Sequence, residues 1–177
     1  NAGWYETIKR KIYKSSQAIT KGSSDNRIIV FGENQEVLPY KLANCCNPIP
    51  GDKIFGFTTV EDGIKIHKDD CPNSIQLRSN YAYRILESNW VDREKIDFIA
   101  TINVKGIDRL GLINNVTKII SSQMNVNMRA ININSDDGVF EGVITLFVHN
   151  VTVLNTLTEK LKNVDGITKI KRTYKHI

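Results

Sequence analysis

The segment Asp97-Phe98-Ile99-Ala100-Thr101-Ile102-Asn103-Val104 carries an apolar side chain at every second position from Phe98 onward. Phe98, Ala100, Ile102 and Val104 fall on one face, a pattern that predicts a β-strand with one buried face. A polar loop containing a glycine follows over residues 105–109. Apolar residues at helical spacing then predict a helix over residues 112–120. This strand and helix begin the most readable part of the chain.

Two further strands are predicted beyond that helix, over residues 125–135 and 139–148. Asp136-Asp137-Gly138 between them is a typical hairpin turn. The apolar phase of the first strand changes after Ala130, which predicts a β-bulge at that point. The pair is therefore expected to form a hairpin whose first strand is bent.

The last elements are a helix and a strand. Asn150 can cap a helix that Gly166 can terminate, and residues 167–173 predict the final strand. The resulting order, β-α-β-β-α-β, is that of a complete ferredoxin-like unit. In this fold both helices cover the same face of a four-stranded sheet, so the other face stays open.

The open face is expected to be apolar. Strand 139–148 carries Phe140, Ile144, Leu146 and Val148 on one side, but it also has apolar residues on the other. We assign five residues to the open face: Val143, Phe147, Ile99, Ile131 and Ile133. An apolar open face implies that a second copy of the chain or another domain covers it. We therefore expect a homodimer formed through this sheet face.

The first half of the chain has a different pattern. Residues 1–20 predict a basic helix, and a linker rich in glycine and serine extends to residue 26. Residues 27–32 predict a short strand. We expect three parts: a helical lead-in and linker over residues 1–26, a small module over 27–94, and the ferredoxin-like domain over 95–177.

Closely spaced turn signals run from Val37 to Trp90. Short apolar pieces lie between them at residues 53–58 and 64–67, and residues 73–80 predict a short helix. The pattern indicates a small β-rich module with a thin core. The fold class of the whole chain is therefore predicted to be α+β.

Composition restricts the classes of protein that the chain can belong to. Its 177 residues are 41% hydrophobic and 24% charged, which is typical of globular domains and excludes wholesale disorder. No apolar run reaches the roughly 20 residues of a membrane span, and no secretory leader is recognisable. We expect a cytoplasmic protein without membrane contact. The first residue is not Met, so we expect a fragment or a processed chain.

The formal net charge of +5 permits contact with nucleic acid without requiring it. The three cysteines, Cys45, Cys46 and Cys71, are more informative because all lie within 27 residues. An odd number without a secretory leader argues against a disulfide scaffold. Clustering of this kind points to metal binding or to thiol chemistry.

With His67 the cysteines form the pattern C-C-x20-H-x3-C, whose four donors suit a tetrahedral zinc ion. Adjacent side chains usually diverge, so Cys45 and Cys46 need an unusual local backbone to reach one ion. Asp69 or Asp70 is an alternative ligand. Another alternative is that one or more of the cysteines is simply a small buried apolar residue. A purified sample can lack the zinc if the ligand set is incomplete.

Motifs of catalysis are missing from the sequence. It contains no P-loop, no G-x-G-x-x-G, no H-E-x-x-H and no G-x-S-x-G. We therefore expect no catalytic activity in this chain and favour a binding or regulatory role.

The cysteine segment has a close counterpart in a known family. Leu-Ala-Asn-Cys-Cys-Asn-Pro-Ile-Pro-Gly-Asp-Lys-Ile-Phe-Gly-Phe-Thr-Thr (42–59), then Gly-Ile-Lys-Ile-His (63–67) and Cys-Pro-Asn (71–73), resembles the conserved-cysteine, zinc-finger-like domain of the RelA/SpoT proteins. These proteins make and degrade (p)ppGpp in the bacterial stringent response. The final unit, with Asp-Arg-Leu-Gly-Leu-Ile (108–113), resembles an ACT domain, which follows the cysteine domain in that family.

The resemblance implies that the chain is the C-terminal regulatory region of a GTP diphosphokinase and (p)ppGpp 3'-pyrophosphohydrolase. The catalytic domains would lie upstream, and this region would contact ribosomal RNA and tRNA to sense translation. ACT domains also pair and bind small effectors, often amino acids. The residues expected to bind such an effector lie at the loop before the first helix: Gly106, Asp108, Arg109, Leu110, Gly111, Leu112 and Asn114.

Basic residues are the candidates for RNA contact. One group lies in the cysteine module and the other on the last strand: Lys53, Lys65, Lys68, Arg78, Lys169, Lys171 and Arg172. Two alternative functions remain: a stand-alone amino-acid-binding module that dimerises, and a redox sensor that uses Cys45 and Cys46 and requires a thiol of low pKa.

Overall fold

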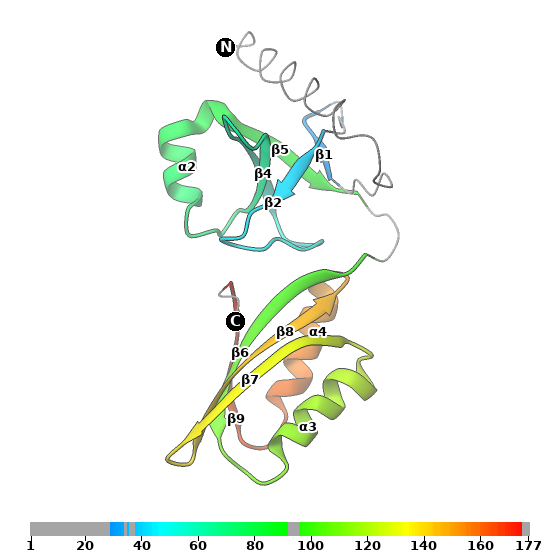
Figure 1. Ribbon diagram of the computed structural model, residues 1–177. Coiled ribbons are helices and arrows are strands. Elements are labelled where there is room, and N and C mark those ends of the chain that lie inside the picture. The colour runs from blue at the N-terminus through cyan, green and yellow to red at the C-terminus, as the bar shows by residue number, and fades with distance from the viewer. Residues whose placement is uncertain (1–28, 34, 36–37, 92–95, 175–177) are drawn as a thin grey trace. The chain divides into compact units, whose positions relative to one another are not determined.

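The structure is a computed structural model that describes residues 29–33, 35, 38–91 and 96–174 (Figure 1). The helix predicted over residues 1–20 and the linker after it lie outside the described residues. Two compact units make up the chain. Unit 1 takes Asn1–Pro48 and Asp52–Glu94, and unit 2 takes Ile49–Gly51 and Lys95–Ile177. Within the described part of the chain, no helix is long and apolar enough to cross a membrane.

Unit 1 is built on a five-stranded sheet with the order β1-β5-β3-β4-β2. Its strands are β1 (Ile29–Phe31), β2 (Tyr40–Leu42), β3 (Ile54–Thr58), β4 (Ile64–Lys68) and β5 (Ile85–Trp90). A helix, α2 (Ser74–Tyr81), and a 3-10 turn, η1 (Ala82–Arg84), connect β4 to β5. The predicted strands 53–58 and 64–67 and the helix 73–80 are confirmed, so the module is β-rich as expected.

Strands β3 and β4 form an antiparallel hairpin that organises the other strands of unit 1. Phe55 lies opposite His67 and Gly56 lies opposite Ile66. β5 pairs with the other edge of β3, and β2 runs parallel to β4 on its outer edge. The side chains of Ile64 and Ile66 are fully buried on one face of β4. The hairpin therefore carries the centre of the unit 1 core.

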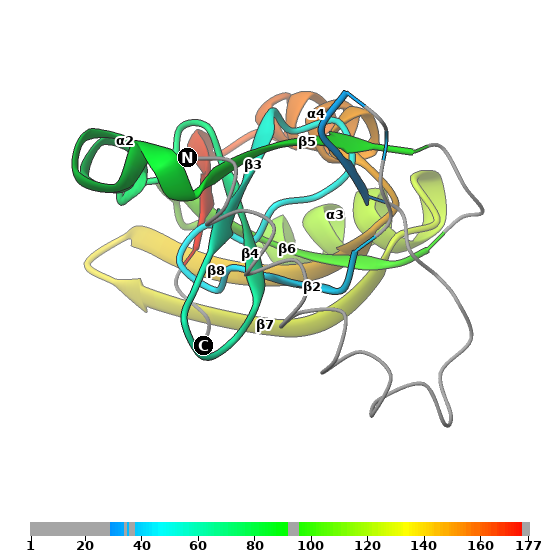
Figure 2. The same ribbon diagram turned by 90° about the horizontal axis from the view of Figure 1, so that it is seen from above.

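Unit 2 has the predicted order of strands and helices. Its elements are β6 (Phe98–Ile107), α3 (Leu112–Lys118), the π-helical turn η2 (Ile119–Gln123), β7 (Asn127–Asp136), β8 (Val139–Val148), α4 (Val151–Lys162) and β9 (Ile167–Thr173). The sheet order is β7-β8-β6-β9. Figures 1 and 2 show α3 and α4 on the same face of this sheet. The ferredoxin-like prediction is confirmed, and Asn150 caps α4 by accepting a hydrogen bond from the Val153 N–H at 2.9 Å.

The predicted bulge in β7 is confirmed, but its effect on two side chains differs from the prediction. The pairing of β7 with β8 shifts between Met128 and Ala130. Beyond the shift Ile131 lies opposite Ile144, and Ile133 packs against the helix-covered core. Placing Ile131 and Ile133 on the open face was therefore wrong, because the extra residue of the bulge turns them to the other side.

The open face of the unit 2 sheet is less apolar than the sequence suggested. At its centre Thr101 and Thr145 lie opposite each other, with their hydroxyl oxygens 3.3 Å apart. Val143 and Phe147 are half-buried on the same face of β8. Dimerisation through this face stays a prediction.

Gly106 allows a close approach between β6 and the turn before β9. A Cβ atom at this position would lie 1.9 Å from the Gly166 carbonyl oxygen and 2.7 Å from the Phe140 ring. The Ile107 N–H donates to that same Gly166 oxygen at 2.7 Å. No side chain fits in this space unless the backbone moves.

We therefore expect Gly106→Ala to lower the free energy of unfolding of unit 2 by about 3 kcal/mol or more, as overpacking against rigid backbone does. Hydrogen exchange of the β6 and β9 amides measures the loss. Gly142→Ala is the matched control, because its Cβ would meet the Ile133 side chain at 3.0 Å, which can move. It should cost less than about 1 kcal/mol. Equal losses for both variants would contradict this explanation.

Candidate metal centre

Cys45 and Cys46 lie in a tight turn that directly follows β2. The Ala43 N–H donates to the Ile66 carbonyl of β4 at 2.9 Å, which fastens the start of the turn to the sheet. The Asn47 N–H then returns to the Ala43 carbonyl at 2.9 Å, and Asn47 has a φ of 41°. Asparagine tolerates this left-handed conformation better than most residues. The turn supplies the unusual local backbone that two adjacent cysteine ligands require.

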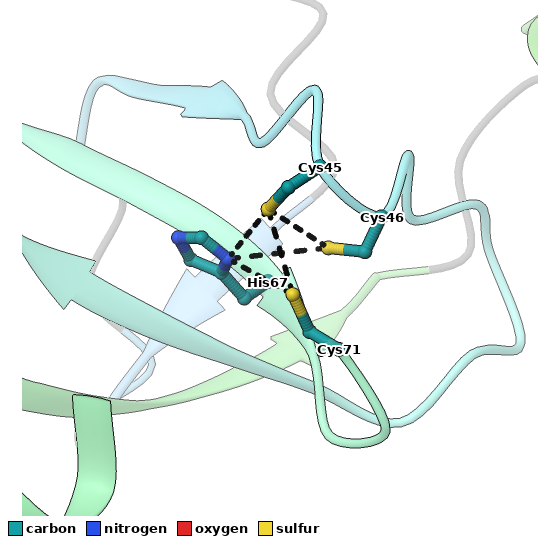
Figure 3. Close-up of side chains that lie close together, drawn as sticks. All are labelled: Cys45, Cys46, His67 and Cys71. Carbon is teal, nitrogen blue, oxygen red and sulfur yellow. Dashed lines mark hydrogen bonds between the residues drawn. The ribbon is translucent and has the colours of Figure 1, made fainter. Parts of the chain in front are cut away.

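His67 and Cys71 reach the same place from the other segment. His67 lies in β4, and Cys71 lies in the loop between β4 and α2. The Cys71 N–H donates to the Lys68 carbonyl at 3.1 Å, and the Cys71 carbonyl accepts from the Ser74 N–H at 2.9 Å. This loop turns the chain back sharply after β4, so that the thiol of Cys71 faces the imidazole (Figure 3).

The four predicted donor atoms lie within 4.8 Å of one another. Five of the six separations are Cys45 Sγ to His67 Nδ1 at 3.4 Å, Cys45 Sγ to Cys71 Sγ at 3.5 Å, Cys71 Sγ to His67 Nδ1 at 3.7 Å, and 3.9 Å from Cys46 Sγ both to Cys45 Sγ and to His67 Nδ1. A tetrahedral ion bound at ~2.3 Å to sulfur and ~2.0 Å to nitrogen needs donor separations of about 3.5–3.8 Å. The cluster could therefore hold a metal ion with little rearrangement.

The donors are shielded from solvent. Cys46 is 0%, Cys71 3% and His67 7% exposed, whereas Cys45 is half-buried. The sulfur of Cys46 also accepts a hydrogen bond from the Lys68 backbone N–H at 3.3 Å. A hydrogen bond of this kind favours the charged thiolate that binds metal.

Burial determines the protonation of the donors in the metal-free protein. It raises the pKa of the Cys46 thiol strongly, and burial also raises the pKa of Cys71. Burial and, to a smaller extent, the charge of Lys65 lower the pKa of His67. Near neutral pH the cluster therefore has protonated Cys46 and Cys71 thiols and a neutral imidazole. A raised thiol pKa is the opposite of what a redox-sensing cysteine needs.

The two carboxylates considered as alternative ligands point elsewhere. Asp69 pairs with Arg78 at 2.6 Å, and Asp70 pairs with Lys68 at 3.0 Å. Among the described residues, the group of potential ligands contains only the three cysteines and His67. Two neighbours of this group, the Lys68 backbone N–H and the ring of Phe55, were not predicted from the sequence. The signal available for the ring was the presence of two aromatic residues, Phe55 and Phe57, at every second position of the predicted strand 53–58.

The loop predicted to bind an effector already has internal partners. The carboxylate of Asp108 accepts a hydrogen bond from the Ser135 hydroxyl at 2.6 Å, and the Arg109 guanidinium pairs with Asp165. Leu112 is buried in the core at 2% exposure. Its N–H donates to the Arg109 carbonyl at 3.1 Å.

The remaining loop residues differ in their surroundings. Gly106 packs against the turn before β9, whereas Leu110 and Asn114 are exposed. Gly111 precedes α3 with a φ of 82° and has open space around it. Amino-acid binding at this loop stays a prediction.

The basic residues of unit 1 are mostly engaged within the protein. The Lys68 side chain is only 8% exposed and pairs with Asp70, so it is not available for phosphate contact. Lys65 pairs with Asp62 at 2.7 Å, whereas Lys53 is exposed. Arg78 pairs with Asp69, as described above.

The basic residues of β9 are arranged differently. Lys169 and Lys171 are exposed and lie opposite Lys105 and Asn103 of β6. Ile170 between them is buried in the core, so both lysines lie on the open face of the sheet. Arg172 lies over the ring of Tyr174, with 5.8 Å between its Cζ atom and the ring centroid. Lys169 and Lys171 therefore present their charges on the same face of the sheet.

Two family models match the chain. Residues 28–91 match the RelA/SpoT RIS domain, and residues 94–172 match the ACT domain. A RIS domain followed by an ACT domain is the arrangement that the sequence resemblance implied. The chain belongs to the RelA/SpoT family, and its cysteine module is consistent with the RIS domain.

Relatives extend over both domains. The GTP pyrophosphokinase of Escherichia coli K12 is 30% identical over 169 residues, which are 94% of this chain and 22% of that protein. The bifunctional (p)ppGpp synthase/hydrolase RelA of Mycobacterium tuberculosis is 33% identical over 133 residues, 75% of this chain and 18% of that protein. The crystal structure of the ACT domain from the Chlorobium tepidum GTP pyrophosphokinase aligns at 37% identity and a TM-score of 0.41, covering 44% of this chain and 100% of that chain. The chain spans about a fifth of the length of these two full-length relatives.

The described environment of the thiols predicts their order of reactivity. In metal-free protein at pH 7.5 we expect iodoacetamide to label the half-buried Cys45 before Cys46, because burial and a raised pKa keep Cys46 protonated. Raising the pH to 9 should leave Cys46 slow, since burial raises its pKa strongly and also limits access of the reagent. Mass spectrometry of the labelled peptides measures both rates. Labelling of Cys46 as fast as Cys45 would contradict the described burial.

Proposed function

We propose that this chain is the regulatory part of a (p)ppGpp synthetase/hydrolase, and that it senses translation through contact with the ribosome and tRNA. The observation that supports this proposal is the order of RIS and ACT domains over residues 28–172, together with similarity to GTP pyrophosphokinase along 94% of the chain. In this proposal the catalytic domains belong to the remainder of the full-length protein. The two units described here then bind the ribosome and tRNA and transmit the resulting signal to the catalytic domains.

We further propose that the ion held by unit 1 is zinc. Three sulfurs and one imidazole nitrogen are soft and borderline donors, which favour zinc over magnesium or calcium. All four positions would be filled by the protein, as in structural rather than catalytic zinc sites. Zinc would join the turn at residues 43–47, the strand β4 and the loop before α2. Such a link is useful in a small module, because a thin core alone gives little stability.

The zinc site is tested by removing one ligand. We expect the wild-type chain, purified in reducing buffer, to contain about one zinc per molecule and Cys71→Ser to bind zinc roughly 100-fold more weakly or worse. Elemental analysis and competition with a chromophoric chelator measure these values. Asp70→Asn is the control, because this residue directly precedes Cys71 in the same loop yet lies outside the cluster. A wild-type chain without stoichiometric zinc, or a loss equal in both variants, would refute the site.

RNA contact is assigned to the exposed basic residues of β9. Lys169 and Lys171 lie on an open sheet face with Lys105 opposite Lys169, and Phe147 is half-buried on the same face. A sheet face with lysines and a partly exposed aromatic ring is suited to an unpaired RNA segment, because rings stack on bases and lysines contact phosphates. This arrangement supports the proposed contact with ribosomal RNA.

We expect Lys169→Glu/Lys171→Glu to lower the affinity of the chain for ribosomes at least ~10-fold and to reduce its salt dependence. Co-sedimentation with ribosomes, with and without deacylated tRNA, measures the change. Lys118→Glu/Lys160→Glu is the matched control, since it makes the same change in net charge at exposed positions of the helices α3 and α4. Unchanged binding of the β9 variant, or an equal loss in the control, would refute the assignment.

A further inference from the structure

The β3–β4 hairpin places an aromatic ring directly across from the histidine of the metal centre. Phe55 of β3 and His67 of β4 are antiparallel partners in the register. Their ring centroids are 5.6 Å apart and their planes differ by only 18°, so the two rings are stacked. Phe55 is 2% exposed. The stack is therefore a buried cross-strand pair, and its geometry follows from the pairing of the two strands.

Arg78 of α2 contacts Phe55, the phenylalanine of this stack. Its guanidinium carbon lies 4.4 Å from the centroid of the Phe55 ring, a cation–π distance. The same guanidinium donates to Asp69 at 2.6 Å. Asp69 belongs to the short loop that leads from His67 to Cys71. Arg78 therefore connects the ring beside one ligand to the loop that carries another.

The stack restricts one particular motion of His67. An imidazole turns about its Cβ–Cγ bond, and turning it out of plane would remove its face from Phe55. In the stacked orientation the Nδ1 atom lies 3.4 to 3.9 Å from all three thiols. The ring plane that Phe55 favours is thus the plane in which Nδ1 faces the space between the sulfurs. Ordering a ligand before the metal arrives reduces the conformational entropy that binding costs.

We propose that Phe55, steadied by Arg78, is a positioning residue for the metal centre: it fixes the plane of the His67 ring so that Nδ1 is directed at the ion. This inference rests on the zinc site proposed above. Phe55 itself contributes no ligand atom. It acts through His67, in the way that groups behind metal ligands orient them and raise their affinity.

The hairpin contains its own control. Phe57 lies two residues further along β3, on the same face as Phe55, and is also buried at 8% exposure. Arg84 lies over its ring at 4.9 Å, much as Arg78 lies over Phe55. The strand partner of Phe57 is Lys65, however, which is not a ligand. Phe57 and Phe55 therefore match in strand, burial and cation–π contact, but only Phe55 stacks on His67.

The test compares Phe55→Leu with Phe57→Leu in the 177-residue chain, since leucine keeps an apolar side chain but removes the flat ring. Zinc affinity is measured by chelator competition, and ligand geometry by the visible absorption of the cobalt(II) form. We expect Phe55→Leu to bind zinc about 10-fold more weakly and to alter the cobalt spectrum. Phe57→Leu should keep the wild-type affinity and spectrum. Phe55→Tyr, which retains an aromatic ring, should keep the wild-type zinc affinity and cobalt spectrum.

A second measurement does not depend on metal. In metal-free protein, NMR relaxation of the His67 ring carbons should show a more mobile imidazole in Phe55→Leu than in wild type or Phe57→Leu. Wild-type zinc affinity and spectrum in Phe55→Leu, or equal losses in both leucine variants, would overturn the positioning role. A wild-type chain that binds no zinc would instead refute the proposed site itself, so the two failures are distinguishable.

Discussion

The antiparallel register of β3 and β4 is the constraint on which the candidate metal centre depends. It sets His67 opposite Phe55 and leaves the Lys68 N–H facing the sulfur of Cys46. The same strand, β4, pairs through Ile66 with the start of the turn that bears the adjacent cysteines. A slip of one residue would turn the imidazole to the opposite face of the sheet. Strand pairing therefore brings the four donor side chains together.

Unit 2 depends on a comparable constraint of backbone rather than of side chains. The close approach of Gly166 to β6 is possible because residue 106 has no Cβ. It brings the turn between α4 and β9 against β6, so that β9 can pair with β6 at the edge of the sheet. The loop between β6 and α3 starts at this point, so its shape is inherited from the same contact. In both units a local backbone contact helps to position the candidate site residues.

Much of this architecture could be predicted from the sequence, because unit 2 has long strands with regular alternation and well-capped helices. The four donors were also visible, since cysteine and histidine are few. The strands β2 and β5 were missed for physical reasons. β2 has only three residues and lies at an edge of the sheet. The segment Ile85–Trp90 contains several polar residues, so its own sequence does not indicate a strand. It becomes one because it pairs with β1 on one side and β3 on the other. The face on which Ile131 and Ile133 lie could not be predicted without knowing the position at which the bulge inserts its extra residue.

The strand order of unit 1 has a consequence for how the chain folds during its synthesis. β5 is the last strand of the unit to leave the ribosome, yet it lies between β1 and β3 and pairs with both. Until residue 90 has emerged, β1 has no partner strand among the described residues, although all three cysteines and the histidine are already outside. The nascent module thus exposes its thiols before its sheet can close, a feature typical of topologies dominated by distant contacts. The β3–β4 hairpin and the turn that carry the four donors can therefore meet before β5 completes the sheet.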